Sequence, residues 1–393
     1  IVNRNTAGTG VAVATIVASI AGAWILFSPA ETGTRMGILA LIGYGLGSTA
    51  AMVAFAILGP RMRQLMPAGH SITEYVWYRF GLSMYLFTLA VMVFYMFTFL
   101  TAELTGIAQA LRLVANVPLV WTAIIVAVAT VAYTSYGGIR ASIFTDNIQF
   151  ALIIPILLLV LIAIIIGLGG MGKAFDPVSK TAPHLLSLTY GPGMEFGVVL
   201  IIAILGADLF HQGFWQRVFT CRDDRPLRRS FLIGGLLALP IVLFAGLFGI
   251  IAVGYGIPEQ EFSVALFTLV IEAMPTWVVM VVLVLAIALV MSSMDTVLNG
   301  IASAVTSDLS HFRPGIEVPQ LLRTSRIVTV VVALPAVLIA AQGYSVLYLF
   351  LIADLVVAAS AFPVFYGLYA KRLTQTVALT SCLTGIVLGA LFF

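Results

Sequence analysis

Apolar runs of about 20 residues recur along the chain, and they constrain its fold more than any other feature, because this length crosses a lipid bilayer as a helix. Hydrophobic residues make up 61% of the chain and charged residues only 9%. This leaves no long polar tract that could form a soluble domain or a linker. The two cysteines, Cys221 and Cys382, fall on opposite predicted sides of the membrane, so neither a disulfide nor a metal site is expected from them. We therefore expect an all-α, multi-pass membrane protein.

Breaks at Pro, Gly and charged residues divide the apolar runs into eleven predicted spans. The spans cover residues 8–29, 36–59, 81–112, 117–137, 142–169, 194–219, 229–254, 275–307, 320–342, 344–369 and 374–393. If the N-terminal end is cytoplasmic, the cytoplasmic connections collect Arg61, Arg63, Arg79, Arg140, Arg217, Arg222, Arg225, Arg228, Arg229, Arg313, Arg323, Arg326, Lys371 and Arg372. The opposite side receives only Arg35, Arg112, Lys173 and Lys180. This asymmetry follows the positive-inside rule.

Two of the predicted spans look broken. The first, "VATIVASIAGAWILFSPAETG", mixes small and β-branched residues before Ser28-Pro29, and the sixth, "VVLIIAILGADLFHQGFWQRV", carries polar residues and glycines at its centre. Each opens a group of five spans, residues 8–169 and 194–369, and the odd number gives the two groups opposite orientations. Paired interruptions in inverted repeats predict a central binding site in a secondary transporter. The alternative is a pair of ordinary helices that tolerate Gly and Pro.

A polar stripe runs along the eighth span. At about 100° per residue, six of its polar residues fall on one narrow face. They are Ser292, Asp295, Thr296, Asn299, Ser303 and Thr306, and Ser293 lies at the edge of the same face. Facing lipid would be costly, so the stripe faces a partner helix, a water-filled cavity or an ion. The hydroxyl groups could serve in helix packing alone; the Ser292–Ser293 pair, facing unwound carbonyls, would suit a dehydrated monovalent cation.

Asp146 is a second acidic residue inside a predicted span. It follows a predicted turn at Gly137–Gly138, which ends the fourth span, and is carried into the fifth. We expect Asp146 one or two turns from the cytoplasmic surface, where it could exchange a cation with water. The alternative is an interfacial acid near a helix N-terminus, favoured by the helix dipole.

Four motifs resemble the sodium/solute symporter family, whose members carry sugars, proline, sialic acid, iodide or urea. They are "PAGHSITEYVWYRFG", "GGIRASIFTDNIQ", "FWQRVFTCRDDRPLRRS" and "VMSSMDTVLNGIASAVTSDL", and the resemblance covers nearly the whole chain. It implies one transporter domain over residues 1–393, with a ten-helix inverted-repeat core, broken first and sixth helices and one additional C-terminal helix. It also implies alternating access driven by a sodium gradient. Members usually have a helix before the core, so we expect the chain to be a piece of a longer polypeptide.

The resemblance also implies ion ligands. The residues similar to the first sodium site are Ala18, Ala21, Leu289, Ser292 and Ser293. The residues similar to a second sodium site of some members are Asp146, Asp295 and Thr296. Two departures argue against a sugar as the solute. The aromatic gate of sugar carriers aligns near Ala207, and a polar residue common inside the first break aligns with Ile20.

By analogy with the same fold, six residues are expected to line the solute pocket. They are Trp24, Tyr95, Asp208, His211, Gln212 and Asp354. Asp208 and Asp354 could equally be structural acids at a break, and Tyr95 could be core packing. No Lys or Arg is predicted at the midplane, which favours an uncharged polar or amine-bearing solute over an anion.

Sodium-coupled import of a small polar solute is therefore the expected function, with Na⁺ as the coupling ion and the bilayer of the cell membrane as the location. A proton could replace sodium, in which case Asp146 or Asp295 would titrate. The fold could instead be the membrane module of a nutrient sensor that signals through an attached domain. No nucleophile–base pair, phosphate loop or metal cluster indicates an enzyme, and no nucleic-acid partner is expected.

Overall fold

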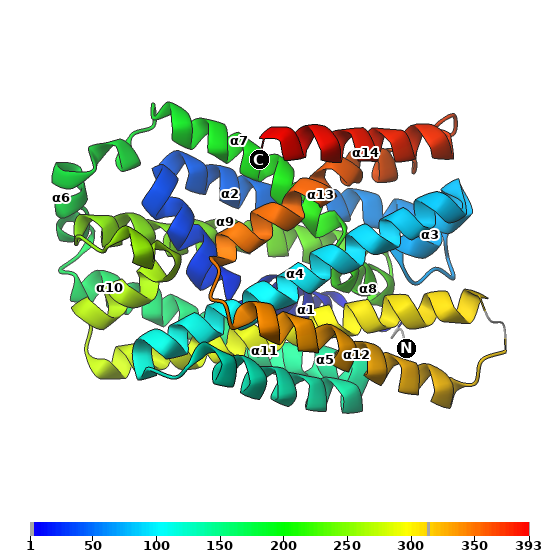
Figure 1. Ribbon diagram of the computed structural model, residues 1–393, viewed down its shortest axis with the longest axis horizontal. Coiled ribbons are helices and arrows are strands. Elements are labelled where there is room, and N and C mark those ends of the chain that lie inside the picture. The colour runs from blue at the N-terminus through cyan, green and yellow to red at the C-terminus, as the bar shows by residue number, and fades with distance from the viewer. Residues whose placement is uncertain (1–3, 313–314, 393) are drawn as a thin grey trace.

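The computed structural model describes residues 4–312 and 315–392, and all of their side chains except those of 136–142, 154, 307–312 and 318. The side chain of Arg140 and the whole of Arg313 therefore lie outside the described residues, and Gly137–Gly138, where a turn was predicted, lie inside the helix α5, Leu119–Gly167. Helices make up nearly all of the described chain (Figure 1). The α-helices are α1 Thr9–Ile20, α2 Trp24–Leu65, α3 Ile72–Phe80, α4 Leu82–Ala115, α5 Leu119–Gly167, α6 Met171–Thr181, α7 Gly191–Leu209, α8 Gln212–Thr220, α9 Asp224–Gly254, α10 Ala265–Ala273, α11 Thr276–Phe312, α12 Val318–Ala340, α13 Val346–Tyr366 and α14 Gln375–Phe392. Two short 3₁₀ helices are η1 Pro183–Leu186 and η2 Glu259–Val264.

Within the described chain, 9 helices are long and apolar enough to cross a membrane, and α1 and Leu119–Ser135 are shorter apolar helices. Two of the long elements contain more than one predicted span. α2 has 42 residues and bends at Gly37, whose φ of 71° is easily adopted only by glycine. It therefore holds both the second half of the first predicted span and the whole of the second.

α5 also contains two crossings, because both of its ends lie at the same end of the bundle. Leu119 lies against Gly343, just beyond α12, and Gly167 lies against Met274, just before α11. Since α11 and α12 pack side by side and run antiparallel, these two positions share one end (Figure 1). With these subdivisions the helices accommodate the eleven predicted spans.

The centre of the bundle is built from helices that are far apart in sequence. α2 packs most extensively on α9 and α7. The Phe55 ring of α2 lies 4.9 Å from the Trp215 ring of α8 and 5.0 Å from the Phe231 ring of α9, centroid to centroid. Close van der Waals packing of this kind holds helices together where lipid replaces water.

The segments predicted to be cytoplasmic meet at one end of the bundle. Arg4 donates to the carbonyl oxygen of Pro67, and Arg63 donates to that of Cys221 at 2.8 Å. In Figure 1, α3 and the N-terminal end lie toward the right, whereas α6 and α10 lie at the opposite end. α14 packs on α13 and is the additional C-terminal helix.

Candidate functional site

The first span is broken, as predicted. α1 ends at Ile20, α2 begins at Trp24, and Ala21 between them has φ −78° and ψ 83°, outside the helical region. Carbonyl groups at the end of a helix lack their usual intrahelical donors. One of them, Ala18 O, accepts a hydrogen bond of 3.1 Å from the Ser292 hydroxyl of α11.

The sixth span is also broken, as predicted. α7 ends at Leu209 and α8 begins at Gln212, with Phe210 and His211 between them. The Trp215 indole N–H donates to the Leu209 carbonyl at 2.8 Å, which satisfies one of the carbonyls freed by the break. Because α8 contacts both α1 and α11, the two breaks belong to one region of the bundle.

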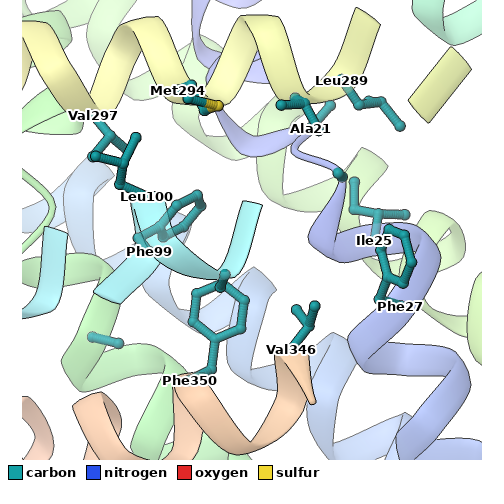
Figure 2. Packing of buried hydrophobic residues seen from close by; sticks show 14 of the residues in the cluster. Ala21, Ile25, Phe27, Phe99, Leu100, Leu289, Met294, Val297, Val346 and Phe350 are labelled. Carbon is teal, nitrogen blue, oxygen red and sulfur yellow. The ribbon is translucent and has the colours of Figure 1, made fainter. Parts of the chain in front are cut away.

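The structure brings the residues predicted for the first sodium site to one buried place between α1 and α11. They are Ala18, Ala21, Leu289, Ser292 and Ser293, and all are buried. Ser293 is 3.1 Å from the Leu289 carbonyl, and Figure 2 shows Ala21 beside Leu289. Hard cations prefer oxygen ligands, and unwound helix carbonyls commonly supply them to Na⁺.

Glu103 of α4 lies at the same place and was missed from the sequence. Its carboxylate accepts hydrogen bonds from the backbone N–H groups of Ala23 at 2.9 Å and Trp24 at 3.1 Å. The Ser293 hydroxyl donates to Glu103 Oε2 at 2.5 Å. The sequence does carry a signal for this residue, because Glu103 is an acid in the apolar third span, "FTFLTAELTG".

Asp146 is paired with a guanidinium group. Arg217 Nη2 donates to Asp146 Oδ2 at 2.8 Å, and both side chains are buried. Thr15 also donates to Asp146 Oδ2, at 2.5 Å. The charge pattern placed Arg217 in a cytoplasmic connection; the structure instead places it within α8, with its guanidinium group buried beside Asp146. Arg217 therefore already balances the charge of the Asp146 carboxylate, without a second sodium ion.

Asp295 and Thr296 adjoin this ion pair. Arg217 Nη2 also donates to Thr296 Oγ1 at 3.0 Å, and Thr296 Oγ1 lies 3.3 Å from Asp295 Oδ1. Thr145 of α5 is 3.4 Å from Asp295 Oδ2. Within the described side chains, Asp146 Oδ1 is buried and has no hydrogen-bond partner. The cluster thus contains two carboxyl groups and one guanidinium group.

A central cavity of about 50 Å³ lies next to the two breaks. Its lining consists of Ser19, Ile20, Trp24, Tyr44, Ser48, Met52, Tyr95, Phe99, Ile204, Ala207, Asp208, Phe214, Phe350 and Asp354. Four of the six predicted pocket residues, namely Trp24, Tyr95, Asp208 and Asp354, are in this lining. Tyr44, Phe99 and Phe350 were missed, because an aromatic residue in an apolar span gives no sign of whether it faces a cavity or lipid.

The other two predicted pocket residues, His211 and Gln212, are not among the residues that line this cavity. Gln212 is the first residue of α8, just beyond the break in the sixth span. Its Nε2 donates to the His70 carbonyl at 3.0 Å. The His211 ring packs between Phe214, at 4.6 Å, and the edge of Phe99, at 5.4 Å. His211 therefore contacts two aromatic residues of the cavity lining without being part of that lining.

The cavity is acidic and aromatic. Tyr95, Asp208 and Asp354 line the cavity together, and the two carboxyl groups are close enough to interact electrostatically. The lining contains no Lys, Arg or His. None of the ion pairs in the described part of the chain involves Asp208 or Asp354. The Trp24 and Tyr44 rings are stacked in the wall, with centroids 5.8 Å apart and planes 10° apart.

Comparison with known proteins agrees with this architecture. A spermidine transporter of Candida albicans is 31% identical over 356 residues, which cover 90% of this chain and 66% of the relative. The urea active transporter of Saccharomyces cerevisiae is 28% identical over 258 residues, or 59% of this chain and 34% of the relative. The sodium/proline symporter of Escherichia coli is 26% identical over 227 residues, or 55% and 45%. The chain thus spans two thirds or less of the length of these relatives, which are transporters and not enzymes.

The fold is shared with solved transporter structures. A sodium-coupled sialic acid symporter in a substrate-bound, outward-open state superposes with a TM-score of 0.76 over 98% of this chain and 90% of that chain, at 19% identity. A nucleobase–cation symporter superposes with a TM-score of 0.60 over 98% and 92%, at 12% identity. The family model "Sodium:solute symporter family" matches residues 1–385. The chain therefore belongs to the sodium:solute symporter family, in agreement with the 9 helices of its described part that could cross a membrane.

Proposed function

We propose that this protein imports a small, amine-bearing organic solute by sodium-coupled symport. The observation that carries the proposal is the central cavity, in which Asp208 and Asp354 face an aromatic lining that contains no basic side chain. The solute amine would be held between these carboxyl groups and the faces of Trp24 and Tyr44.

The electrostatics of the cavity favour a positive ligand. A carboxylate within a membrane is costly unless a cation or several hydrogen bonds compensate it. A protonated amine would supply that charge, and aromatic faces attract cations with about 0.5–2 kcal/mol each. An uncharged solute such as urea would leave both acids without a counter-charge, and this is why we favour an amine. The likeness to a spermidine transporter supports the same choice.

Sodium would bind at the first-span break. Ala18, Ala21, Leu289, Ser292 and Ser293 offer carbonyl and hydroxyl oxygens at one buried place, and the sodium-coupled relatives support this ion. Proton coupling is the rival, since one relative is a urea–proton symporter of Oryza sativa. The cluster of oxygens from a helix break and two adjacent serines favours a metal cation over a proton.

A second sodium would bind at Asp146, Asp295 and Thr296. Arg217 balances only one of the two carboxylates, so an ionised pair leaves a net charge of −1 at this place. The buried Asp146 Oδ1 has no partner among the described side chains and is available as a ligand. A bound Na⁺ would compensate both the charge and this oxygen.

The solute would enter from the outer side of α13. A vestibule of about 300 Å³, lined by Glu31, Arg35, Phe196 and Tyr348 among others, includes Leu351 of α13. The cavity begins on the same helix at Phe350 and Asp354. Phe350, in the cavity lining, packs edge-on against Phe99, with ring centroids 5.2 Å apart (Figure 2). Movement of this aromatic pair would open the cavity outward.

The test is uptake into proteoliposomes. Radiolabelled spermidine, putrescine, proline and urea are each offered with an inward sodium gradient, with an inward proton gradient, and with neither. We expect sodium-driven uptake of an amine, and Asp354→Asn should strongly reduce it at low solute concentration while Gln212→Ala, which lies outside the cavity, should not. Uptake driven by protons alone, or of urea alone, would contradict the proposal.

A further inference from the structure

Glu103 occupies a position that links the first sodium site to the solute cavity. Its carboxylate touches Ser293, a proposed sodium ligand, and the backbone N–H of Trp24, whose side chain lines the cavity. The side chain is completely buried. One residue of α4 therefore contacts both the ion-binding hydroxyl of α11 and the restart of the broken first span.

In the described part of the chain, every hydrogen-bond donor to the Glu103 carboxylate is uncharged. These are the Ser293 hydroxyl and the N–H groups of Ala23 and Trp24, and none of the ion pairs there includes Glu103. The buried guanidinium of Arg217 is engaged by Asp146. Donors at the start of a helix stabilise an anion but leave its net charge in place. A cation bound at Ser293 would be separated from this charge by one hydroxyl group.

The same contact orients the serine. A hydroxyl has one proton, and the shortest of the three contacts of Ser293 Oγ is that to Glu103 Oε2, at 2.5 Å, against 3.1 and 3.2 Å to Leu289 O and Val290 O. With the proton directed to Glu103, the lone pairs of the oxygen are left for a cation.

Glu103 and Trp24 pack closely against Gly22, at the break in the first span. A Cβ atom added at Gly22 would lie 2.7 Å from Glu103 Oε1 and 2.6 Å from the Trp24 side chain. Only glycine therefore lets the carboxylate approach the restart of the helix at this distance.

We propose that Glu103 is a positioning residue of the sodium site: it supplies the negative charge that balances Na⁺ and orients Ser293 toward the ion, and it connects ion binding to the Trp24 wall of the cavity. This inference rests on the proposed sodium coupling. Glu103 itself does not ligate the ion.

Sodium alone tests the inference, without knowledge of the solute. The thermal stability of the purified full chain is titrated with NaCl against choline chloride, and the midpoint shift gives an apparent sodium affinity. Glu103→Gln keeps the shape and removes the charge, and we expect its apparent Kd for sodium to rise about tenfold or more, since a charged hydrogen-bond network is lost. Glu103→Asp, which keeps the charge, should recover part of the affinity. Glu261→Gln, which removes a carboxylate in η2, is the matched control and should leave the affinity unchanged.

Two further variants make the result specific. If Glu103 acts through Ser293, adding Glu103→Gln to Ser293→Ala should weaken sodium binding much less than it does in the parent. Should Glu103→Gln fail to fold, Gly22→Ala displaces the carboxylate instead and should also weaken sodium binding. An unchanged sodium affinity in a folded Glu103→Gln or Gly22→Ala protein would overturn the inference. A parent with no sodium-dependent stabilisation and no sodium-driven uptake would instead refute the proposed function.

Discussion

Replacing Arg217 with Met would leave the Asp146 carboxylate buried without its cation. The guanidinium group makes hydrogen bonds of 2.8 Å to Asp146 and 3.0 Å to Thr296, as well as longer ones to Thr15 and Gly213. Hydrogen bonds that involve a charged group contribute about 1.5–3 kcal/mol each, so the two shortest account for about 3–6 kcal/mol. Removal of one partner of a buried ion pair costs about 3–5 kcal/mol, in agreement with that sum. We expect Arg217→Met to lower the free energy of unfolding by this amount.

The assay is unfolding of the purified protein in mixed micelles by increasing denaturing detergent, followed by tryptophan fluorescence. Adding Asp146→Asn to Arg217→Met removes the orphaned charge and should restore most of the lost stability. The control is Arg222→Met, because the Arg222 side chain is 68% exposed and pairs with an exposed Asp223; such a pair contributes about 0–1 kcal/mol. The reasoning is refuted if Arg217→Met costs no more than the control, or if Asp146→Asn does not rescue it.

Three further predictions concern transport. Ser292→Ala removes a proposed cation ligand and should raise the sodium concentration for half-maximal uptake about tenfold, with the solute Kd at saturating sodium unchanged; sodium activation curves that overlay the parent's would contradict this. Asp354→Asn should weaken amine binding at saturating sodium about tenfold or more, as expected for loss of a bond to a charged group. Gln212→Ala should bind the amine as the parent does. Equal effects of the two substitutions would argue against the cavity as the solute site. Asp295→Asn should reduce the sodium Hill coefficient of uptake from above one toward one, and a parent coefficient of one would exclude the second ion.

The local features of this protein could be read from its sequence. Membrane spans follow from apolar runs of bilayer length, since each residue in such a run must be compatible with lipid whatever the rest of the fold does. The breaks near Ala21 and His211 follow from polar or small residues at the centre of such runs. The Ser292–Ser293 pair was found because a polar stripe on one face of an apolar helix must face something other than lipid.

The tertiary structure decided which polar groups meet. Ser293 and Glu103 are 190 residues apart, and Arg217 and Asp146 are 71 residues apart. The spacing of hydrophobic residues along one helix shows which of its faces is apolar. It does not show which other helix packs against that face, so the sequence pattern does not reveal these pairs. Arg217 was therefore assigned to the cytoplasm by its charge, and Gln212 was assigned to the cavity by its position in a broken span. Only the packing of α8 against α1, α2 and α11 determines that the guanidinium group is buried and that the Gln212 amide lies outside the cavity, since that packing sets the free energy of burying each group.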